Sequence, residues 1–186
     1  TKLLIFWDHN LQNLNAARLV CLELGITNRQ FYNKISTFKG ASNRLELIKK
    51  TDISSIYKDF AHSPSKLKAT CKAMKKQFPK KEIVACLELH TFSSLNQRFL
   101  KEYKNSMNDP DIAIVYFNPE AIKHKKLDYI DKEEVYRSFN RQDLLIFTDS
   151  VKLEKYLKSL NHSNKNILMM SSGNFNGINL NMIIKD

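Results

Sequence analysis

The chain has 186 residues, and its 30 Lys and Arg against 19 Asp and Glu give a net charge of +11. Hydrophobic residues make up 42% and aromatic residues 10%, which is typical of a packed globular protein and excludes wholesale disorder, while four Gly and four Pro exclude a collagen or a low-complexity linker. The longest apolar runs are far shorter than the roughly 18 residues that cross a membrane, so we expect no membrane partner.

Residues 1–43 are predicted to form a short strand and two helices. The strand is Leu3–Trp7, and apolar residues at helical spacing follow over Leu11–Leu24. Gly25 stands where a helix commonly ends, and Thr27 is predicted to cap the second helix. Because the chain starts with an apolar strand and without Met, we expect it to be a piece of a longer protein, and it lacks the features of a signal peptide.

From residue 44 onward, strand and helix patterns alternate. The predicted strands are Arg44–Lys49, Ser54–Phe60, Ile83–Leu89, Ile112–Phe117, Leu144–Thr148 and Ile167–Met170. The predicted helices are Ser65–Phe78, Leu95–Met107, Lys132–Phe139, Val151–Leu160 and Phe175–Lys185. The last four strands are apolar almost throughout, as expected for strands buried on both faces. This pattern predicts an α/β fold with a doubly wound, mainly parallel, Rossmann-like sheet over residues 44–186.

Ligands of such sheets bind outside the carboxyl ends of the strands, and several polar segments follow strands here. Asp59 and His62 lie between the end of one predicted strand and the start of a predicted helix. A carboxylate there can accept two hydrogen bonds from a ribose diol. The simpler alternative is a capping Asp beside a surface His. His90 ends another strand, with Glu88 two residues before it, and is either a ligand or base, or a hydrogen-bonded structural His.

Two further segments have residues suited to nucleotides and anions. The loop Ser171–Gly177 follows a buried strand, and its Gly and Asn residues tolerate positive φ, so it can turn tightly and aim backbone N–H groups at an anion. Asn10 and Asn13 near a helix start can read an adenine edge or simply cap the helix. The chain contains no P-loop motif.

The cysteines and lysines favour ordinary structural roles. Cys21, Cys71 and Cys86 lie among apolar residues without a CxxC pair, which predicts three buried free thiols in a reducing, cytoplasmic compartment. The His and Cys residues show no zinc spacing, and no metal site is expected in this chain. The predicted helix Ser65–Phe78 is rich in Lys, which favours a solvated face; a basic nucleic-acid-binding module remains a distant alternative.

The order of the motifs resembles the Mur ligase family, the ATP-dependent enzymes that build the peptidoglycan stem peptide. The motifs are His9-Asn10-x-x-Asn13, Phe38-x-Gly40-x-x-x-Arg44, Asp59-Phe60-Ala61-His62-x-Pro64 and His90-Thr91-Phe92-Ser93. The resemblance spans nearly the whole chain. It implies that residues 1–43 are the end of the family's central ATPase domain, and that residues 44–186 are its complete C-terminal domain. Because the P-loop is missing, we expect this fragment to be inactive alone.

The resemblance also implies roles for individual residues. The implied ATP-binding residues are His9, Asn10, Asn13, Arg44, Asp59 and His62. Asn10 and Asn13 would lie against the adenine, Asp59 would hold the ribose, and Arg44 would reach the γ-phosphate as the catalytic residue. His90, Ser172, Gly173 and Asn174 would line the pocket of the incoming amine substrate. ATP and Mg²⁺ are the implied cofactors, with the magnesium ligands mainly outside this chain.

The identity of the acceptor depends on one loop. The stretch Met170–Ile178 is similar to the family branch that joins UDP-N-acetylmuramate, through an acyl phosphate, to the recycled tripeptide L-alanyl-γ-D-glutamyl-meso-diaminopimelate. The branch that adds L-alanine usually ends in a different loop and often carries Arg where this chain has Ser94. The tripeptide is therefore the expected acceptor and L-alanine the alternative. The other expected partner is the rest of the parent chain, and no nucleic acid is expected.

Overall fold

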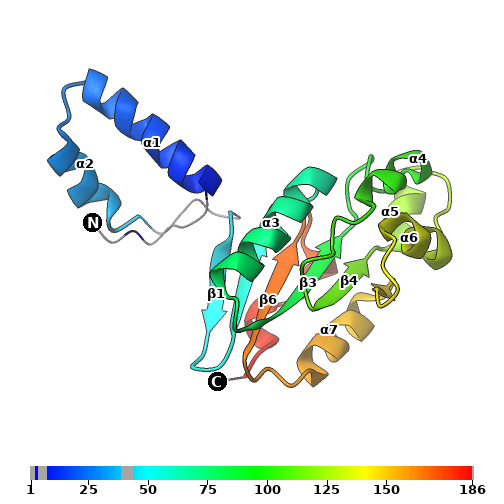
Figure 1. The fold of residues 1–186 in the computed structure, drawn as a ribbon. Coiled ribbons are helices and arrows are strands. Elements are labelled where there is room, and N and C mark those ends of the chain that lie inside the picture. Colours follow the sequence, from blue (N-terminus) through cyan, green and yellow to red (C-terminus); the bar gives the residue numbers. More distant parts are fainter. Residues whose placement is uncertain (1–2, 4–7, 39–43, 186) are drawn as a thin grey trace. The chain divides into compact units, whose positions relative to one another are not determined.

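The structure is a computed structural model that describes residues 3, 8–38 and 44–185 (Figure 1). It divides into two compact units, Thr1–Arg44 and Leu45–Asp186, and each is described here by itself. Apart from Leu3, the predicted strand Leu3–Trp7 lies outside the described residues, as does Gly40.

The described part of the first unit is a pair of helices, α1 (Asp8–Glu23) and α2 (Asn28–Ile35), and both predicted helices are confirmed. Gly25 has a left-handed φ of 82°, which ends α1 because glycine adopts this conformation without a steric cost. Thr27 begins α2 with a capping box, in which Thr27 and Gln30 each satisfy a backbone N–H of the other.

The second unit is built on one sheet, which has six strands in the described residues. They are β1 (Glu46–Lys50), β2 (Ser55–Asp59), β3 (Glu82–Glu88), β4 (Ile112–Tyr116), β5 (Leu145–Phe147) and β6 (Lys165–Met170). Their spatial order is β1-β2-β6-β3-β4-β5; β1 is antiparallel to β2, and every other neighbouring pair is parallel. The mainly parallel α/β prediction is therefore confirmed, and the last strand in the sequence lies near the middle of the sheet.

Helices pack on both faces of this sheet. On one face, Leu153 and Leu157 of α7 (Ser150–Ser159) join a buried cluster with alternate residues of the strands, such as Val84 and Cys86 of β3. The other face is covered by α3 (Pro64–Gln77), whose buried residues are Leu67, Thr70, Cys71 and Met74. Because both faces are covered, β3 is buried along almost its whole length, as its apolar sequence predicted.

The region between β3 and β5 differs from the prediction. The predicted helix Leu95–Met107 is wrong in extent: α4 (Gln97–Leu100) is a single turn, followed by a 3-10 turn at Lys101–Tyr103. The chain then leaves the helical path, because Asn105 has a φ of 59° and donates its N–H to the carbonyl of Phe139. The short helix α5 (Pro119–His124) was not predicted.

The chain end and the edge strand also correct the prediction. A helix over Phe175–Lys185 is wrong, because the described residues form two 3-10 turns, Phe175–Gly177 and Leu180–Met182. Phe175, Asn176 and Gly177 all have positive φ, which a right-handed helix cannot accommodate. The strand predicted as buried at Leu144–Thr148 is the edge strand β5, and its residues are only half-buried. The predicted helix Lys132–Phe139 is confirmed as α6.

Candidate functional site

The carboxyl ends of β2, β6 and β3 are neighbours, so the polar residues that follow these strands share one edge of the sheet. The backbone N–H of Ser171, just after β6, donates to the carbonyl of Asp59 at the end of β2 at 3.0 Å. On the other side of β6, Met170 is in register with Leu87 of β3. The structure therefore brings the segments of Asp59, Glu88 and Ser171 together, as the predicted strand ends required.

Asp59 is a buried carboxylate held by the backbone. Its Oδ1 accepts the N–H of Ala61 at 2.7 Å, and its Oδ2 accepts the N–H of Leu45 at 2.7 Å. These bonds fix the orientation of the Asp59 carboxylate. Asp59 thus has the structural role that the simpler alternative expected.

His62 is fixed by its neighbours. Its Nδ1 lies 2.8 Å from the carbonyl oxygen of Phe60, which can only accept, so Nδ1 carries a proton and Nε2 of the neutral ring is an acceptor. The Phe60 ring meets the imidazole edge-on at a centroid distance of 4.9 Å. The hydroxyl of the buried Tyr103 donates to the backbone carbonyl of His62 at 2.5 Å, and burial raises the pKa of Tyr103. This hydroxyl therefore stays protonated.

Glu88 anchors the loop after β6. It is only 4% exposed, and its Oε2 accepts hydrogen bonds from the Ser171 hydroxyl and from the N–H of Phe175, the latter at 2.8 Å. The oxygen of Ser171 also accepts the N–H of Gly173 at 2.6 Å. A buried carboxylate needs such donors, because burial removes its water. The loop backbone is therefore tied to the end of β3.

The same loop lies against His90. A Cβ built on Gly173 would come within 2.9 Å of Glu88 Oε2 and of His90 Cγ, so a larger residue here would force one of these side chains to move. The Nδ1 of His90 lies 3.8 Å from Glu88 Oε1. The Oγ of Ser172 is buried and has no hydrogen-bond partner among the described residues. Of the four predicted acceptor residues, the structure brings Gly173 against His90, and the half-buried Ser172 and the exposed Asn174 are the chain neighbours of Gly173.

The backbone of this loop has positive φ, but not only at the Gly and Asn residues where the sequence predicted it. Asn176 and Gly177 have φ values of 55° and 86°, as expected for Asn and Gly, whereas Asn174 has a φ of −138°. Phe175 has a φ of 55°, which is unusual for an aromatic residue. Its buried ring stacks on Tyr116 at a centroid distance of 6.3 Å, which holds this conformation.

The predicted ATP residues are divided between the two units. Asn10 and Asn13 lie in the first turns of α1, where Asn10 is half-buried and Asn13 is exposed, and the side chain of His9 lies outside the described residues. Arg44 is exposed at the end of the first unit, whereas Asp59 and His62 belong to the second.

Glu88 is the site residue that sequence reasoning left without a role. Its position in the sequence points to a role, because it is an acidic residue that directly follows the buried apolar residues Ile83–Leu87 of β3. Acidic residues are almost never fully buried unless they are paired. Its partners could not be identified, because Ser171 and Phe175 follow 83 and 87 residues later.

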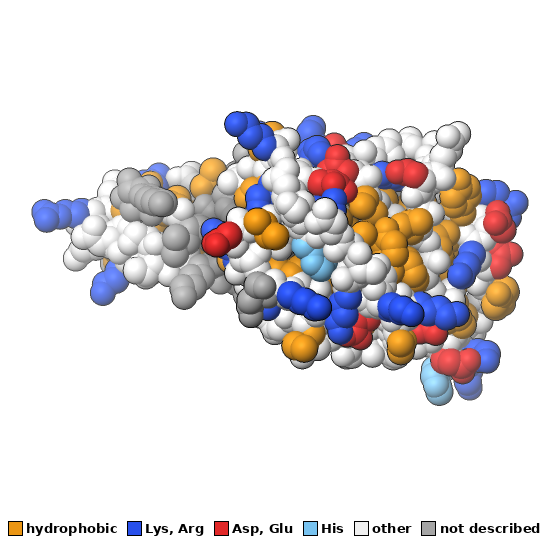
Figure 2. Space-filling view, turned by 90° about the horizontal axis from the view of Figure 1, so that it is seen from below, with side chains coloured by type: hydrophobic (Ala, Val, Ile, Leu, Met, Phe, Trp, Pro, Cys, Tyr) orange, Lys and Arg blue, Asp and Glu red, His pale blue; other side chains and the backbone are white. Residues whose placement is uncertain are grey.

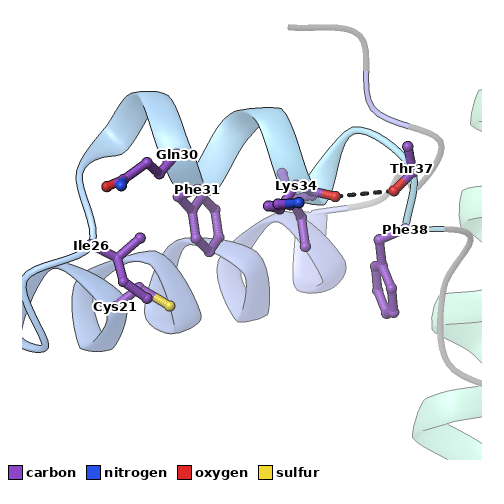
Figure 3. A pocket seen from close by; sticks show the side chains of 8 residues that line it. Cys21, Ile26, Gln30, Phe31, Lys34, Thr37 and Phe38 are labelled. Carbon is purple, nitrogen blue, oxygen red and sulfur yellow. Dashed lines mark hydrogen bonds between the residues drawn. The ribbon is translucent and has the colours of Figure 1, made fainter.

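The first unit has a mainly apolar groove. It has a volume of ≈ 710 Å³ and lies between α1, α2 and the residues after α2 (Figure 3). Its lining residues are Cys21, Ile26, Gln30, Phe31, Lys34, Ile35, Thr37 and Phe38. Cys21 is half-buried there, so the prediction of three buried thiols is wrong for this residue; Cys71 and Cys86 are buried, and all three are free.

The described residues contain no group of three or more His, Cys, Asp and Glu side chains that could hold a metal ion. In the same part of the chain, no helix has the length and apolar character that spanning a membrane requires.

The lysines of α3 form a mostly solvated surface. Lys66, Lys68, Lys72 and Lys76 are exposed, while Lys75 pairs with Asp111 at 2.6 Å. Figure 2 shows one face of the second unit, on which Lys and Arg side chains are scattered with Asp and Glu among them. No continuous basic patch is visible on this face.

The chain is similar to UDP-N-acetylmuramate–L-alanine ligases. The chain is 34% identical over 135 residues to the UDP-N-acetylmuramate–L-alanine ligase of Caldicellulosiruptor bescii, a match that covers 73% of this chain and 29% of that protein. It is 29% identical over 175 residues to the enzyme of the same name from Caldanaerobacter subterraneus subsp. tengcongensis, covering 93% of this chain and 37% of that protein. The chain thus spans about a third of these relatives. No protein-family model matches it.

Solved structures agree on the fold. The UDP-N-acetylmuramate–alanine ligase of Thermotoga maritima superposes with a TM-score of 0.73 at 16% identity, over 93% of this chain and 36% of that one. A murein peptide ligase of Psychrobacter arcticus superposes with a TM-score of 0.61 at 20% identity, over 96% of this chain and 37% of that one.

Proposed function

Because this chain belongs to the Mur ligase family and corresponds to its C-terminal region, we propose that it is part of an ATP-dependent ligase that joins an amine acceptor to UDP-N-acetylmuramate. Residues 1–43 would be the end of the ATP-binding domain, and residues 44–186 the domain that receives the acceptor. The proposed reaction activates the muramoyl carboxylate as an acyl phosphate, which the amine then attacks. The parent would work in the cytoplasm, and the isolated fragment would be inactive.

We assign ATP contacts to both units. Asn10 and Asn13, with His9 beside them, would bind the adenine, and Arg44 would neutralise charge at the γ-phosphate, a role suited to a guanidinium because it is always charged. Asp59 would accept hydrogen bonds from the ribose hydroxyls, supported by its fixed orientation. Mg²⁺ would be held mainly by residues of the parent outside this chain.

The acceptor would bind between His90 and the loop that carries Ser172, Gly173 and Asn174. The observation that carries this assignment is the close packing of Gly173 on His90 and Glu88, which makes one preformed surface from two distant segments. Preformed sites lower the ordering cost of binding and hold the attacking amine in position. The net charge of +11 would help to recruit the anionic substrates.

We propose the tripeptide L-alanyl-γ-D-glutamyl-meso-diaminopimelate as the acceptor, on the basis of the loop Ser171–Gly177. Ser94 supports this choice: it is 1% exposed and bonded to Thr91, so the Arg often found there in L-alanine ligases would not fit without rearrangement. L-alanine is the second candidate, because the two relatives compared here are both named L-alanine ligases.

The test uses the full-length parent with Mg-ATP and UDP-N-acetylmuramate, and measures phosphate release with each acceptor separately. Release that depends on the tripeptide supports the first assignment. Release that depends only on L-alanine would support L-alanine as the acceptor. It would contradict the role of the loop Ser171–Gly177 in selecting the acceptor. If neither acceptor stimulates release, the proposed function is wrong.

A further inference from the structure

One buried acidic residue links the parts of the proposed acceptor site. Glu88, at the end of β3, accepts hydrogen bonds from Ser171 and Phe175, and Ser171 in turn accepts the N–H of Gly173. We call these four residues the Glu88 clasp. The clasp closes a loop of the chain 83 to 87 residues long, so it is a product of the tertiary structure.

The clasp retains two features that oppose folding. A carboxylate that is only 4% exposed has lost its water, and Phe175 has a left-handed φ of 55°. The hydrogen bond from the Phe175 N–H gives the buried Glu88 carboxylate a donor, and it helps to hold Phe175 in its left-handed conformation. Such features persist where the surrounding structure requires one particular backbone geometry.

That geometry sets the position of the loop relative to His90. Gly173 leaves no room for a Cβ between its own backbone and the side chains of Glu88 and His90. Ser172 lies between the two loop residues that the clasp fixes, and its buried Oγ has no partner among the described residues. A shift of the clasp would therefore change the position of Gly173 relative to His90.

We propose that Glu88 is a positioning residue of the acceptor site, which presets the loop Ser172–Asn174 against His90 by accepting hydrogen bonds. This inference rests on the proposed function, because that function assigns acceptor binding to the loop. Since preorganisation lowers the cost of binding, loss of the clasp weakens acceptor binding and leaves ATP binding unchanged.

Two substitutions separate hydrogen bonding from charge. Glu88→Gln keeps an acceptor oxygen that can occupy the position of Oε2, and it removes the charge. Glu88→Met has a similar size and removes the acceptor oxygens. Glu82→Gln is the matched control, because Glu82 begins the same strand and its carboxylate bonds to Lys165 at the opposite end of the sheet.

The first experiment measures KM for the acceptor and for ATP in the full-length ligase. We expect Glu88→Met to raise the acceptor KM by about tenfold, the effect of losing one good hydrogen bond, and to leave the ATP KM unchanged. Glu88→Gln and Glu82→Gln should stay close to the unmodified enzyme. The proposal is overturned if Glu88→Met leaves the acceptor KM unchanged. It is also overturned if Glu88→Gln raises the acceptor KM as much as Glu88→Met does, because the charge of Glu88 would then act on the substrate.

The second experiment does not depend on activity. In the 186-residue chain, amide hydrogen exchange followed by NMR should show protection of the Phe175 N–H, retained in Glu88→Gln and lost in Glu88→Met. If Glu88→Met does not fold, Ser171→Ala removes the hydroxyl that donates to Glu88 and accepts the N–H of Gly173, and it should raise the exchange of the Gly173 amide. Rapid exchange of both amides in the unmodified protein overturns the clasp. A parent that is inactive with either acceptor, but whose Phe175 amide is protected, instead refutes only the proposed function.

Discussion

The carboxylate of Asp59 accepts the backbone N–H of Leu45 at 2.7 Å, and Leu45 has a left-handed φ of 45°. This bond ties the segment before β1 to the end of β2. The other carboxylate oxygen accepts the N–H of the buried Ala61. Asp59 therefore holds two backbone segments: the one at Leu45, where the second unit begins, and the one at Ala61, between β2 and α3.

Removing the Asp59 carboxylate should destabilise the second unit. Asp59→Ala leaves two backbone N–H groups without this acceptor, and we expect a loss of about 2 kcal/mol or more in the free energy of unfolding. Asp59→Asn keeps one oxygen and should lose less. Urea denaturation of both variants measures this, with Asp52→Ala in an exposed turn as the control. Equal stability of Asp59→Ala and the control would contradict the prediction.

The ion pair between Lys75 and Asp111 should make stability depend on acid pH. Burial opposes ionisation of Asp111, but the hydrogen bond from Lys75, the N–H of Ile83 and the charge of Lys75 outweigh it and lower its pKa below 3.8. The contribution is therefore present above pH ~4 and lost as the pH falls through the lowered pKa. Because the pair is more than a third exposed, Lys75→Met should cost only about 0.5–1 kcal/mol at pH 7.

Denaturation midpoints from pH 7 to pH 2 check this expectation. The difference between Lys75→Met and the unmodified protein should shrink to zero at the acid end. Lys72→Met, an exposed neighbour on α3, serves as the control and should show no such trend. A difference that persists at pH 2 would mean that Lys75 stabilises the fold by packing and not by charge.

Gly177 should tolerate Asn better than Ala. Its φ is 86° and a Cβ would meet nothing within 4 Å, so the cost of a side chain comes from the backbone alone. We expect Gly177→Ala to lose about 1–2 kcal/mol of stability and Gly177→Asn to lose less, because Asn visits left-handed conformations more readily. Thermal unfolding of the two variants decides the order. Identical midpoints for Ala and Asn would show that the turn relaxes.

The cysteines should differ in reactivity. Burial raises the pKa of the Cys71 and Cys86 thiols, so neither forms a thiolate readily in the native state. Cys21 is half-buried at the groove of the first unit and should react first with a thiol reagent. A spectroscopic thiol assay on the native protein should titrate one group quickly, and two more only after denaturant is added. Cys21→Ser, the control, should abolish the fast phase.

Much of the site could be placed from the sequence because parallel strands end at a common edge. The apolar runs at Ile83–Leu89 and Ile167–Met170 predicted buried strands, and the polar residues after them predicted where chemistry would lie. The capping residues Thr27 and Gly25 similarly located both helices of the first unit. These strands and helices were predicted correctly because spacing and capping are local properties of the chain.

The fold class, three of the four strands expected to be buried and the candidate residues at the strand ends follow from local patterns in the sequence. The position of β6 between β2 and β3, the 3-10 turns over 175–182, and the hydrogen bonds of Glu88 with Ser171 and Phe175 arise only in the folded molecule. The cause is distance along the chain. Strand order and the partners of a buried carboxylate depend on groups more than 80 residues apart, and no local pattern records them.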